Sequence, residues 1–531
     1  MQQPGLSRRQ LNTAALGMAL AALQSAKAQT GAPPPLAPAL RNYPFSLGVA
    51  SGMPRPDSVL LWTRLGGSFL EFCEQCQRHM VIVRYEIYSD MALKKRVQTG
   101  QVTAHSDAAF SVHILARGLQ AGQDYWYRFM LGEAVSPVGH TRTAPALHAR
   151  PQRLRLALAS CQNYEQGYFA AHREIAQQDL DAVLFVGDYI YEGMASKNLL
   201  IAPQRRHTSP AQGNTCKTLA DYRARHAQYK SDPDLQAAHA AHPWIMTWDD
   251  HEVSNDYAND LDQAYTEPAV FLQRRAAAYQ AYFEHMPLLL GPVGSTMRIH
   301  ERFTWGDLAD LWTLDCRQHR SHHACPDAIR GGGRVVLGCD ALADPSRSML
   351  GNHQEAWINE GLRTSKRRWK LLAQSTLIAS SGSDTPFGRT NYTDGWDGYP
   401  QARTRLLQSA AAAQVQGLVV LGGDIHQHIA ANLRVKANDP LSPIVGSELV
   451  SSSVTSRGMS ATLVQSMLAN NPDIVHARAD ERGYALIDCS PSELRCTMRA
   501  TPHPVRQDAQ LSTQAVFAVS PDKAGVRRVN G

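Results

Sequence analysis

Eight side chains that can bind a metal ion follow short apolar runs at four places in the chain. They are Cys161, Asp188, Tyr191, Asp249, Asp250, Asp256, Asp424 and His426. An Asp directly after an apolar run is more often the cap of a following helix, so one such segment is weak evidence. Four segments in succession, offering thiol, phenol, carboxylate and imidazole groups, can surround two or three cations. The pattern therefore predicts a site for several metal ions.

Two members of this set also have simpler interpretations. Cys161 is compatible with a buried structural thiol or with one half of a disulfide, and Tyr191 with a tyrosine of the core. A deprotonated sulfur needs a cation beside it, which favours metal binding by Cys161 where other candidate ligands lie close.

The apolar runs that carry these residues alternate with segments of helical periodicity between residues 152 and 503. We expect strands at Leu154–Ala159, Ala182–Val186, Ile245–Trp248, Leu308–Leu314, Leu371–Ser375 and Leu418–Leu421. We expect helices near residues 168–175, 219–229 and 267–286. Alternating strands and helices predict a layered α/β domain, in which ligands bind beyond the carboxyl ends of the strands. The four candidate segments would meet at that edge.

Residues 43–143 follow a different pattern. Short strands are expected at 59–62, 81–88, 112–115 and 125–129, separated by turn residues and without a helical period. This predicts a small β-sandwich of the immunoglobulin-like or fibronectin type III kind, and the segment Gly118–Arg128 resembles a fibronectin type III strand pair with its corner tyrosine. No residue in this domain suggests chemistry. The polar residues 504–531 are expected to form a C-terminal tail.

The first 28 residues read as an export signal. Arg8 and Arg9 form a twin-arginine pair, the run Ala14–Leu23 is apolar, and Ala26-Lys27-Ala28 is a small-x-small cleavage site. The alternative is a buried or amphipathic N-terminal helix. The export signal predicts that the protein is periplasmic or secreted.

The composition excludes several classes of protein. With 44% apolar and 19% charged residues, the chain of 531 residues is globular rather than disordered or fibrous. No apolar run of about 18 residues is present, so we expect no membrane anchor. The net charge of +6 comes partly from the first 28 residues, and the remaining balance is too even to suggest binding to nucleic acid.

Nine cysteines suit an oxidising compartment, although an odd number leaves at least one unpaired. We expect Cys489 and Cys496 to form a disulfide across the turn 490–495, and Cys161 to stay out of any disulfide. The pair Cys73 and Cys76 is expected to lie in a surface loop rather than in a zinc or redox site. The pairing of the other cysteines is left open.

The order of the four segments resembles that of the calcineurin-like metallophosphoesterases, whose motifs are D-x-H, G-D, G-N-H-E and G-H-x-H. Here Cys161 replaces the first acid, and the segments 187–188, 249–252 and 423–426 correspond to the other motifs. The closer resemblance is to the PhoD-type alkaline phosphatases (alkaline phosphatase D family). It rests also on the segments 45–52, 57–64, 314–317, 394–399 and 448–456, and it spans nearly residues 5–500.

The resemblance implies iron(III) and calcium as cofactors. Cys161 as thiolate and Tyr191 as phenolate would bind iron, since sulfur suits iron better than calcium. The carboxylates of the second and third segments would suit calcium, and Asp424 with His426 would complete the site. By position Asp250 matches the Asn of G-N-H-E and Asp249 would support it, but the sequence does not decide between these two as the direct ligand.

The resemblance further implies hydrolysis of a small phosphate ester by a metal-activated hydroxide, without a protein nucleophile. His251, with Arg317 or Arg403, would stabilise the leaving or non-bridging oxygens. The expected function is thus that of an exported metal-dependent phosphoesterase. Monoesters and diesters are both compatible with it, and the natural ester and the oligomeric state are left open.

Two other functions fit parts of the sequence. An alkaline phosphatase with a serine nucleophile would use Ser451–Ser453, but no ligand pattern surrounds this run. An exported binding protein with an inactive phosphoesterase-like domain would show lost ligands, whereas all four segments are intact. Two further patterns are interpreted without chemistry: the run Gly331–Arg334 as a flexible linker, and a histidine cluster as a solvated loop. The cluster comprises His319, His322 and His323.

Overall fold

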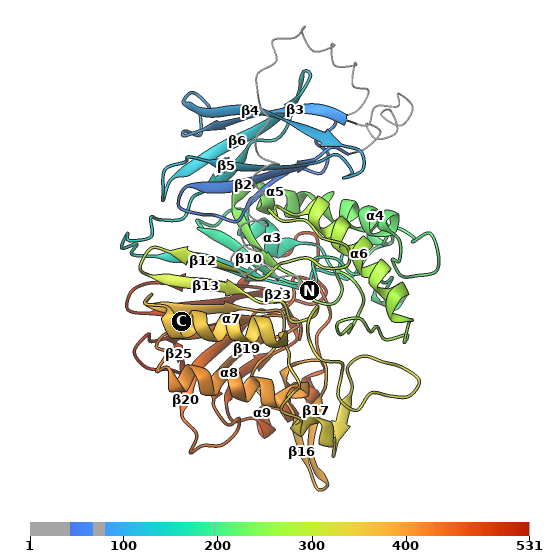
Figure 1. Ribbon diagram of the computed structural model, residues 1–531, viewed down its shortest axis with the longest axis vertical. Coiled ribbons are helices and arrows are strands. Elements are labelled where there is room, and N and C mark those ends of the chain that lie inside the picture. Colours follow the sequence, from blue (N-terminus) through green and yellow to red (C-terminus); the bar gives the residue numbers. More distant parts are fainter. Residues whose placement is uncertain (1–42, 67–79, 196, 530–531) are drawn as a thin grey trace, which may run out of the picture. The chain divides into compact units, whose positions relative to one another are not determined.

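A computed structural model describes residues 43–66, 80–195 and 197–529 of the chain. The expected export signal and the pair Cys73 and Cys76 lie outside these residues. The described strands form four sheets, and the two largest pack face to face. Figure 1 shows helices on the outer side of both large sheets.

The first large sheet has ten strands in the order β25-β24-β23-β22-β9-β10-β11-β1-β2-β5. Its centre is β9 (Leu154–Ala159), β10 (Ala182–Val186), β11 (Pro243–Thr247) and β1 (Val49–Gly52), which run parallel to one another. Side chains of β10 and β11 are buried on both faces, which explains why these strands read as continuous apolar runs. Antiparallel strands flank the centre: β2 (Ser58–Arg64), β5 (Ser111–Arg117), β22 (Glu481–Cys489), β23 (Leu494–Pro502), β24 (Ser512–Val519) and β25 (Val526–Val529).

The second large sheet has seven strands in the order β12-β13-β15-β18-β20-β19-β21. They are β12 (Glu301–Trp305), β13 (Ala309–Thr313), β15 (Trp369–Ala373), β18 (Leu418–Gly422), β19 (His428–Arg434), β20 (Ile444–Val450) and β21 (Ile474–Arg478). The inner faces of the two sheets share one core, in which Leu156 and Leu184 of the first meet Leu311, Leu371 and Val419 of the second.

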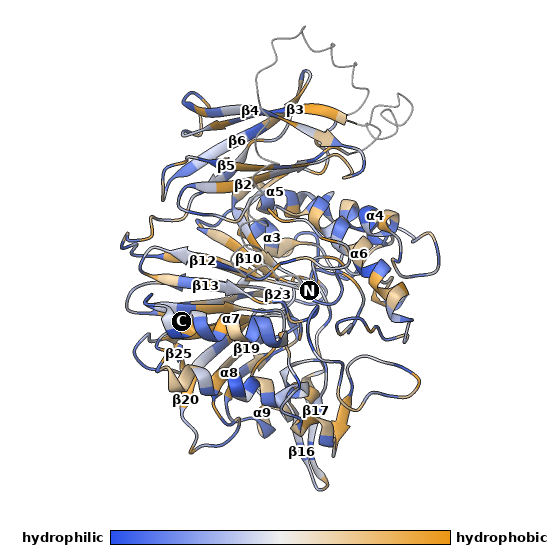
Figure 2. Cartoon of the chain, viewed as in Figure 1, coloured by the Kyte–Doolittle hydropathy of each residue, from blue (hydrophilic) through white to orange (hydrophobic). Residues whose placement is uncertain are grey.

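Helices cover the outer faces of both sheets and complete four layers. The first sheet is covered by α3 (Ala170–Ile175), α4 (Leu219–Lys230), α5 (Pro233–Ala241) and α6 (Pro268–His285), and the second by α7 (Gly351–Thr364), α8 (Pro400–Ala412) and α9 (Ala461–Asn470). Helices such as α4, α6 and α7 carry both hydrophilic and hydrophobic segments, as a helix on a sheet requires (Figure 2). None of the described helices has the length and apolar character needed to cross a membrane. The predicted layered α/β architecture is confirmed.

The predicted N-terminal β-sandwich is also present, but it shares a sheet with the α/β domain. One of its layers is β1, β2 and β5, and β1 pairs in parallel with β11 through Ser51 and Pro243. The other layer is β3 (Met80–Tyr88), β4 (Arg96–His105), β6 (Asp124–Leu131), β7 (Ala134–Val135) and β8 (Gly139–Arg142). The expected corner tyrosine is Tyr125, whose hydroxyl accepts a hydrogen bond from the backbone amide of Gln120 at 2.8 Å. The sandwich therefore extends the central sheet rather than standing apart from it.

The expectation of a C-terminal tail was wrong. Residues 512–519 form β24, which pairs with β23, and residues 526–529 form β25 at the edge of the ten-stranded sheet. Ala515, Phe517 and Val519 alternate into the core between the sheets, so this segment supplies buried apolar surface. The apolar run 515–519 is short and follows three polar residues, 512–514, so the sequence analysis missed the strand.

The expected disulfide between Cys489 and Cys496 was wrong as well, because both are buried free thiols. In the β22–β23 hairpin Cys489 lies opposite Leu494, and Cys496 opposite Ile487. The two cysteines are therefore diagonal neighbours, about 7–8 Å apart, which is too far for a disulfide. Among the described residues, a disulfide joins Cys325 and Cys339, whose Cα atoms are 6.1 Å apart.

A small sheet lies beside the second large sheet and bears on the site described next. It consists of β14 (Val335–Leu337), β17 (Gly388–Tyr392) and β16 (Ser383–Thr385), in that order. In the described part of the chain, short 3-10 helices lie in connecting segments; they are η1 (Lys197–Leu199), η2 (Pro203–Arg205), η3 (Asp340–Ala343) and η4 (Trp396–Gly398).

Candidate metal centre

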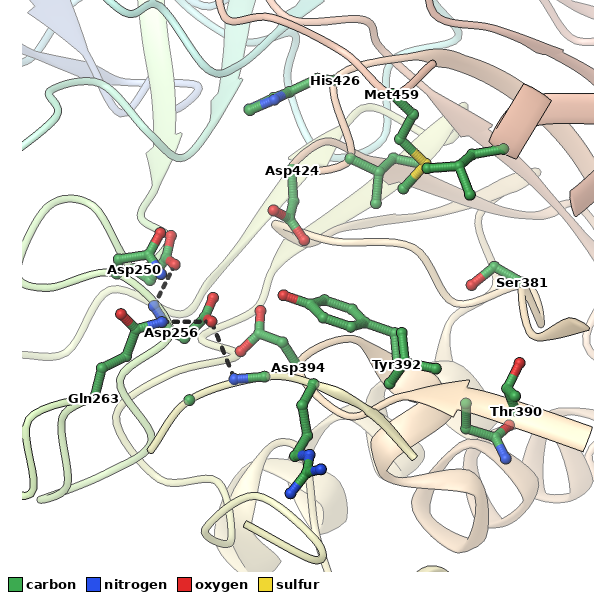
Figure 3. A pocket seen from close by; sticks show the side chains of 18 of the residues that line it. Asp250, Asp256, Gln263, Ser381, Thr390, Tyr392, Asp394, Asp424, His426 and Met459 are labelled. Carbon is green, nitrogen blue, oxygen red and sulfur yellow. Dashed lines mark hydrogen bonds between the residues drawn. The ribbon is translucent and has the colours of Figure 1, made fainter. Parts of the chain in front are cut away.

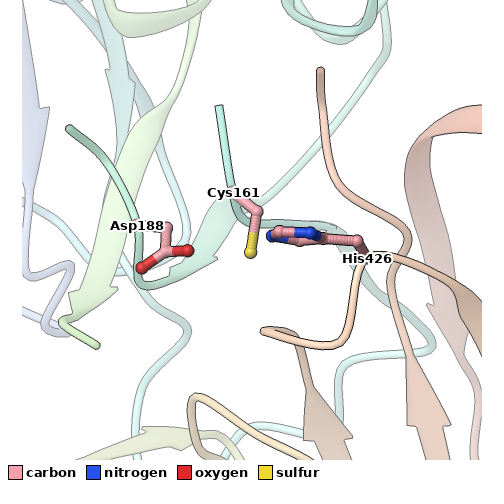
Figure 4. A group of neighbouring side chains, drawn as sticks. All are labelled: Cys161, Asp188 and His426. Carbon is pink, nitrogen blue, oxygen red and sulfur yellow. The ribbon is translucent and has the colours of Figure 1, made fainter. Parts of the chain in front are cut away.

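The carboxyl ends of β9, β10 and β18 bring Cys161, Asp188 and His426 together (Figure 4). The Sγ, carboxylate oxygen and imidazole nitrogen atoms of these three side chains all lie within 4.8 Å of one another. The residues come from segments up to 265 positions apart along the chain, so only the parallel sheet edges could make them neighbours.

Two further groups of possible ligands continue from the first. Asp188, Asp250 and His251 meet within the same 4.8 Å limit, and so do Asp250, Asp256 and Asp394. Because Asp188 and Asp250 each belong to two groups, the three groups form one continuous centre. Asp250, Asp256, Asp394, Asp424 and His426 point into the same cavity (Figure 3).

The backbone that carries these side chains is held in an unusual conformation. Five of the candidate ligands have a left-handed backbone, with φ between 52° and 64°; they are Cys161, Asp188, Asp256, Asp424 and His426. Such residues cost of order 1–3 kcal/mol each and cluster at functional sites. Gly187 precedes Asp188 with φ of 111°, and a Cβ atom there would lie 2.5 Å from Cβ of Asp249. Only glycine allows the two loops to approach this closely.

Glu252, the last residue of the third segment, ties two of the ligand loops together. Its carboxylate accepts hydrogen bonds from the backbone amides of Asp188 at 3.1 Å, Tyr189 at 2.5 Å and Asp249 at 2.8 Å. It therefore fixes the loop after β10 against the loop after β11 without entering the group of ligands itself.

We call Cys161, Asp188, Tyr191 and His426 the thiol side of the centre. The hydroxyl of Tyr191 donates to Asp188 Oδ2 at 2.8 Å, lies 3.1 Å from Nε2 of His426, and accepts from the hydroxyl of Ser456 at 2.6 Å. Nδ1 of His426 donates to the carbonyl of Arg457 at 2.8 Å. The Nε2 atom of His426 therefore carries the lone pair that a metal ion would use.

Burial dominates the electrostatics of the thiol side. It raises the pKa of Cys161 and of Tyr191 well above their usual values, and the charge of Asp188 raises both further. Burial also raises the pKa of Asp188 well above its usual range, although His251 opposes this shift. Among the described residues no group donates to Oδ1 of Asp188. A cation would stabilise all three anions at once, so these residues fit a metal ion.

We call Asp249, Asp394, Arg317 and Arg320 the arginine side. Arg317 donates to Asp249 Oδ1 at 2.6 Å and to Asp394 Oδ1 at 2.7 Å, and Arg320 donates to Asp394 at 2.5 Å. Although burial opposes the ionisation of Asp394, the two guanidinium groups outweigh it and hold its pKa well below the usual range. The protein itself thus balances the charge of Asp394.

The structure separates the roles of Asp249 and Asp250. Asp250 belongs to two of the groups of possible ligands and lines the cavity. Asp249 is paired with Arg317, and burial raises its pKa to about 6. The arrangement therefore favours Asp250 as the direct ligand and Asp249 as its support, the assignment that the motif position suggested.

Neither arginine that we expected to contact the substrate reaches the cavity in the described part of the chain. Arg317 is buried in the carboxylates of the arginine side. Arg403 donates to Asp397 at 2.8 Å and to the carbonyl of Ile378, away from the centre. Both side chains form ion pairs with buried carboxylates, and the spacing of residues in the sequence does not show whether an arginine forms such a pair or binds substrate. The arginines that do line the cavity are Arg330, Arg334 and Arg457.

His251 does line the cavity, beside the thiol side. Its Nδ1 donates to Glu192 Oε2 at 2.6 Å, and its ring lies against that of Tyr191 with centroids 4.1 Å apart. Burial disfavours the charged imidazolium, but Glu192, Asp250 and Asp188 outweigh it and raise the pKa of His251 well above its usual value. Glu192 was missed by the sequence analysis, although it stands next to Tyr191 in the second segment.

The glycine run 331–333 was wrongly interpreted as a linker. The amide of Gly333 donates to Asp256 Oδ2 at 3.0 Å, and Gln263 donates to the same oxygen at 2.7 Å (Figure 3). A Cβ atom on Gly333 would lie 2.5 Å from Cβ of Asp394. The glycines allow the loop between Cys325 and Cys339 to approach the centre, and this long-range contact leaves no local signal in the sequence.

Three other expectations can be compared with the structure. Cys161 is a free thiol, as predicted. His319 and His322 are exposed, but His323 is buried and lies 2.9 Å from Asp394, so the histidine cluster is only partly solvated. Ser452 is buried, and its hydroxyl donates to the carbonyl of Glu481 at 2.9 Å, which gives the serine-nucleophile alternative no support.

The fold and the site define a layered α/β protein with a buried centre of possible metal ligands, and comparison with known proteins gives its family. The family model of PhoD-like phosphatases matches residues 156–498, and the model of the N-terminal domain of these phosphatases matches residues 29–145. The chain therefore belongs to the PhoD-like phosphatase family. The resemblance read from the motifs is confirmed.

This chain is similar to alkaline phosphatase D of Bacillus subtilis (strain 168). The two are 40% identical over 499 residues, which cover 93% of this chain and 84% of the relative. The solved structure of PhoD matches with a TM-score of 0.86 at 40% identity, over 93% of this chain and 94% of that one. A β-glucuronidase of Bacteroides uniformis matches with a TM-score of only 0.20 at 8% identity, over 89% of this chain and 60% of that one.

Proposed function

We propose that this phosphatase is an exported, metal-dependent phosphoesterase that hydrolyses phosphate monoesters or diesters. The observation that carries the proposal is the buried convergence of Cys161, Asp188 and His426 within 4.8 Å, next to further carboxylates that line an open cavity. Acidic groups crowded out of water in this way are unfavourable unless a cation balances them. An inactive binding protein would gain nothing from such a cluster.

The chemistry of the side chains suggests which metals they would hold. We propose iron(III) for the thiol side, because it offers sulfur, phenol and imidazole. We propose calcium for Asp250 and Asp256 with Asp394, because these offer only carboxylate oxygens. Bound cations would draw charge from the phosphoryl oxygens and make a water molecule more acidic.

His251 would act as the proton donor. Its Nδ1–H is held by Glu192 at 2.6 Å, which orients the ring and favours its charged form. The Nε2–H is then available to the oxygen of the departing alcohol. Arg330, Arg334 and Arg457 line the same cavity and would attract the anionic ester.

Chelation of the purified protein tests this proposal. Hydrolysis of 4-nitrophenyl phosphate and of bis(4-nitrophenyl) phosphate should be lost after treatment with a chelator, and calcium with iron should restore it. An acid quench during turnover should trap no phosphoserine. Full activity of the metal-free protein, or a trapped phosphoserine, would contradict the mechanism. Absence of hydrolysis in the metal-loaded protein would favour the binding-protein alternative.

Export is a separate part of the proposal and rests on Arg8, Arg9 and the Ala26-Lys27-Ala28 site. The mature chain should begin near Gln29. Replacing both arginines by lysine should keep the activity in the cytoplasm, as measured by fractionation. Periplasmic activity that the double substitution leaves unchanged would rule out this route.

A further inference from the structure

The catalytic cavity has a large apolar wall that hydrolysis of a phosphate group does not require. The cavity measures about 1100 Å³, more than a phosphate group fills and at the upper end for pockets that bury a drug-sized ligand. Seven apolar or aromatic residues line it: Ile329, Val335, Tyr392, Ile425, Met459, Leu463 and Met467. We call these seven residues the apolar wall.

Several members of the apolar wall are far more exposed than apolar side chains usually are. Ile329 is 91% exposed, Val335 63% and Leu463 59%. Val335 and Tyr392 are cross-strand partners in the small sheet, so they form one surface. Leu337, two residues further along β14, continues it towards exposed Phe387 at the turn between β16 and β17. Contiguous exposed apolar surface of this kind marks a place where a ligand or partner binds.

The apolar wall is continuous with the metal centre. Ile425 stands between Asp424 and His426, so the wall begins where the candidate ligands end. Met459 lies near Asp424 and His426 in Figure 3, and its Sδ accepts a hydrogen bond from Gln427 Nε2 at 3.6 Å. The hydroxyl of Tyr392 points towards the carboxylates of the centre (Figure 3). An apolar group bound on the wall would therefore lie next to the phosphate group bound at the metal centre.

The cavity thus offers two environments side by side. Arg330, Arg334 and Arg457 supply positive charge for a phosphate, and the apolar wall supplies surface for a group that avoids water. A small polar ester such as glycerol phosphate would leave the wall in contact with water and gain nothing from it.

We propose that the preferred substrates are phosphate esters of apolar alcohols, with the apolar chain bound on the wall and the phosphate at the metal centre. This inference rests on the proposed function, since it concerns the same site. Each methylene group buried on the wall should raise kcat/KM about two- to fourfold, until the chain outgrows the cavity.

Two series of homologous substrates test the inference. One consists of 4-nitrophenyl alkyl phosphates and the other of monoalkyl phosphates, each with ethyl, butyl, hexyl and octyl chains, used below the concentration at which they aggregate. For the metal-loaded wild type, log kcat/KM should rise steadily with chain length. In the variant Met459→Gln with Leu463→Gln this rise should largely disappear, so that the ratio of kcat/KM for the octyl ester to kcat/KM for the ethyl ester falls towards one.

Met91→Gln with Leu441→Gln is the matched control, because both residues are strongly exposed and neither lines the cavity. It should keep the dependence on chain length. A wild-type enzyme that hydrolyses the ethyl and octyl esters equally well would overturn the apolar-alcohol inference and leave the proposed function intact. An enzyme that hydrolyses no ester in either series would instead overturn the proposed function. A chain-length dependence that survives in the Met459 and Leu463 variant would place the apolar group elsewhere.

Discussion

The thiol side and the arginine side of the centre both bury several acidic groups, but they balance the charge differently. On the arginine side, Arg317 and Arg320 hydrogen-bond to Asp394 and hold its pKa well below the usual range against the effect of burial. On the thiol side, burial raises the pKa of Cys161 and Asp188, and no guanidinium donates to their ligand atoms among the described residues. Guanidinium groups of the protein thus hold Asp394 in its charged form on the arginine side, whereas the thiol side could be balanced by a bound cation.

This difference also explains why two residues of one motif have different roles. Asp249 and Asp250 are adjacent, yet Asp249 is paired with Arg317 and Asp250 faces the candidate ligands. Removing a group from the thiol side should therefore abolish metal binding and activity. Removing a group from the arginine side should first cost stability.

The largest effect is expected from substitutions on the thiol side. Cys161→Ser and Asp188→Asn should each lower kcat/KM by about 100-fold or more, because even residues that only support metal ligands commonly cost 10–100-fold. Cys489→Ser replaces another buried free thiol, far from the centre, and should change kcat/KM only slightly. Steady-state kinetics with 4-nitrophenyl phosphate measures both. Equal losses in Cys161→Ser and Cys489→Ser would mean that the thiol matters for packing alone.

The next largest effect is expected on the arginine side. Arg317→Met leaves Asp249 and Asp394 buried with less compensation, and breaking a buried ion pair costs about 3–5 kcal/mol. The free energy of unfolding, measured in urea, should fall by that order, and Asp394→Asn in the same chain should recover part of the loss. Arg403→Met should leave KM unchanged, since Arg403 pairs with Asp397 outside the cavity. A large rise in KM for Arg403→Met would restore it as a substrate-binding residue.

The dependence of stability on pH should separate the metal-free from the metal-loaded protein. Burial raises the pKa of Asp249 to about 6 and of Asp256 to about 7, above the value near 3.9 expected in the unfolded chain. Their protonated forms thus stabilise the metal-free fold at low pH, and this contribution is lost as the pH rises through the folded-state values. A bound cation stabilises the ionised carboxylates, so the metal-loaded protein should not lose this stability as the pH rises. The difference in Tm between loaded and chelated protein should grow by several degrees between about pH 5 and pH 7.5. A constant difference would contradict this.

A smaller effect is expected from the disulfide between Cys325 and Cys339. It closes the loop whose Gly333 amide binds Asp256, and closing a loop of about 15 residues stabilises a fold by at most about 3 kcal/mol. Cys325→Ser with Cys339→Ser should lower kcat/KM about three- to tenfold and weaken calcium binding by a similar factor. Calcium titration and kinetics measure the two effects. Unchanged calcium affinity would show that the loop holds Asp256 without the disulfide.

The parts of the molecule that could be predicted from sequence are those with a local signal. Strand β10 was predicted at Ala182–Val186, where it lies, because its side chains are buried on both faces and read as one apolar run. The thiol side could be proposed because each candidate follows such a run directly. Cys161, Asp188 and His426 are indeed neighbours in space.

What could not be predicted depends on contacts between distant segments. Asp394 and Gly333 reach the centre from loops with no strand signal, and the role of Arg317 follows only from its carboxylate neighbours. Strand β24 was missed because its apolar run of five residues is short and follows three polar residues. The diagonal placement of Cys489 and Cys496 depends on hairpin register, which a sequence spacing of seven residues does not fix.

The central claim is that the thiol side holds a metal ion on which hydrolysis depends. Elemental analysis of purified wild type, Cys161→Ser and Cys489→Ser, with the activity of each measured on 4-nitrophenyl phosphate, tests it most directly. We predict that wild type and Cys489→Ser contain the same transition metal and lose it together with activity on chelation, and that Cys161→Ser lacks that metal and is inactive. Full activity in metal-free wild type, or in a Cys161→Ser protein without the metal, would contradict the claim.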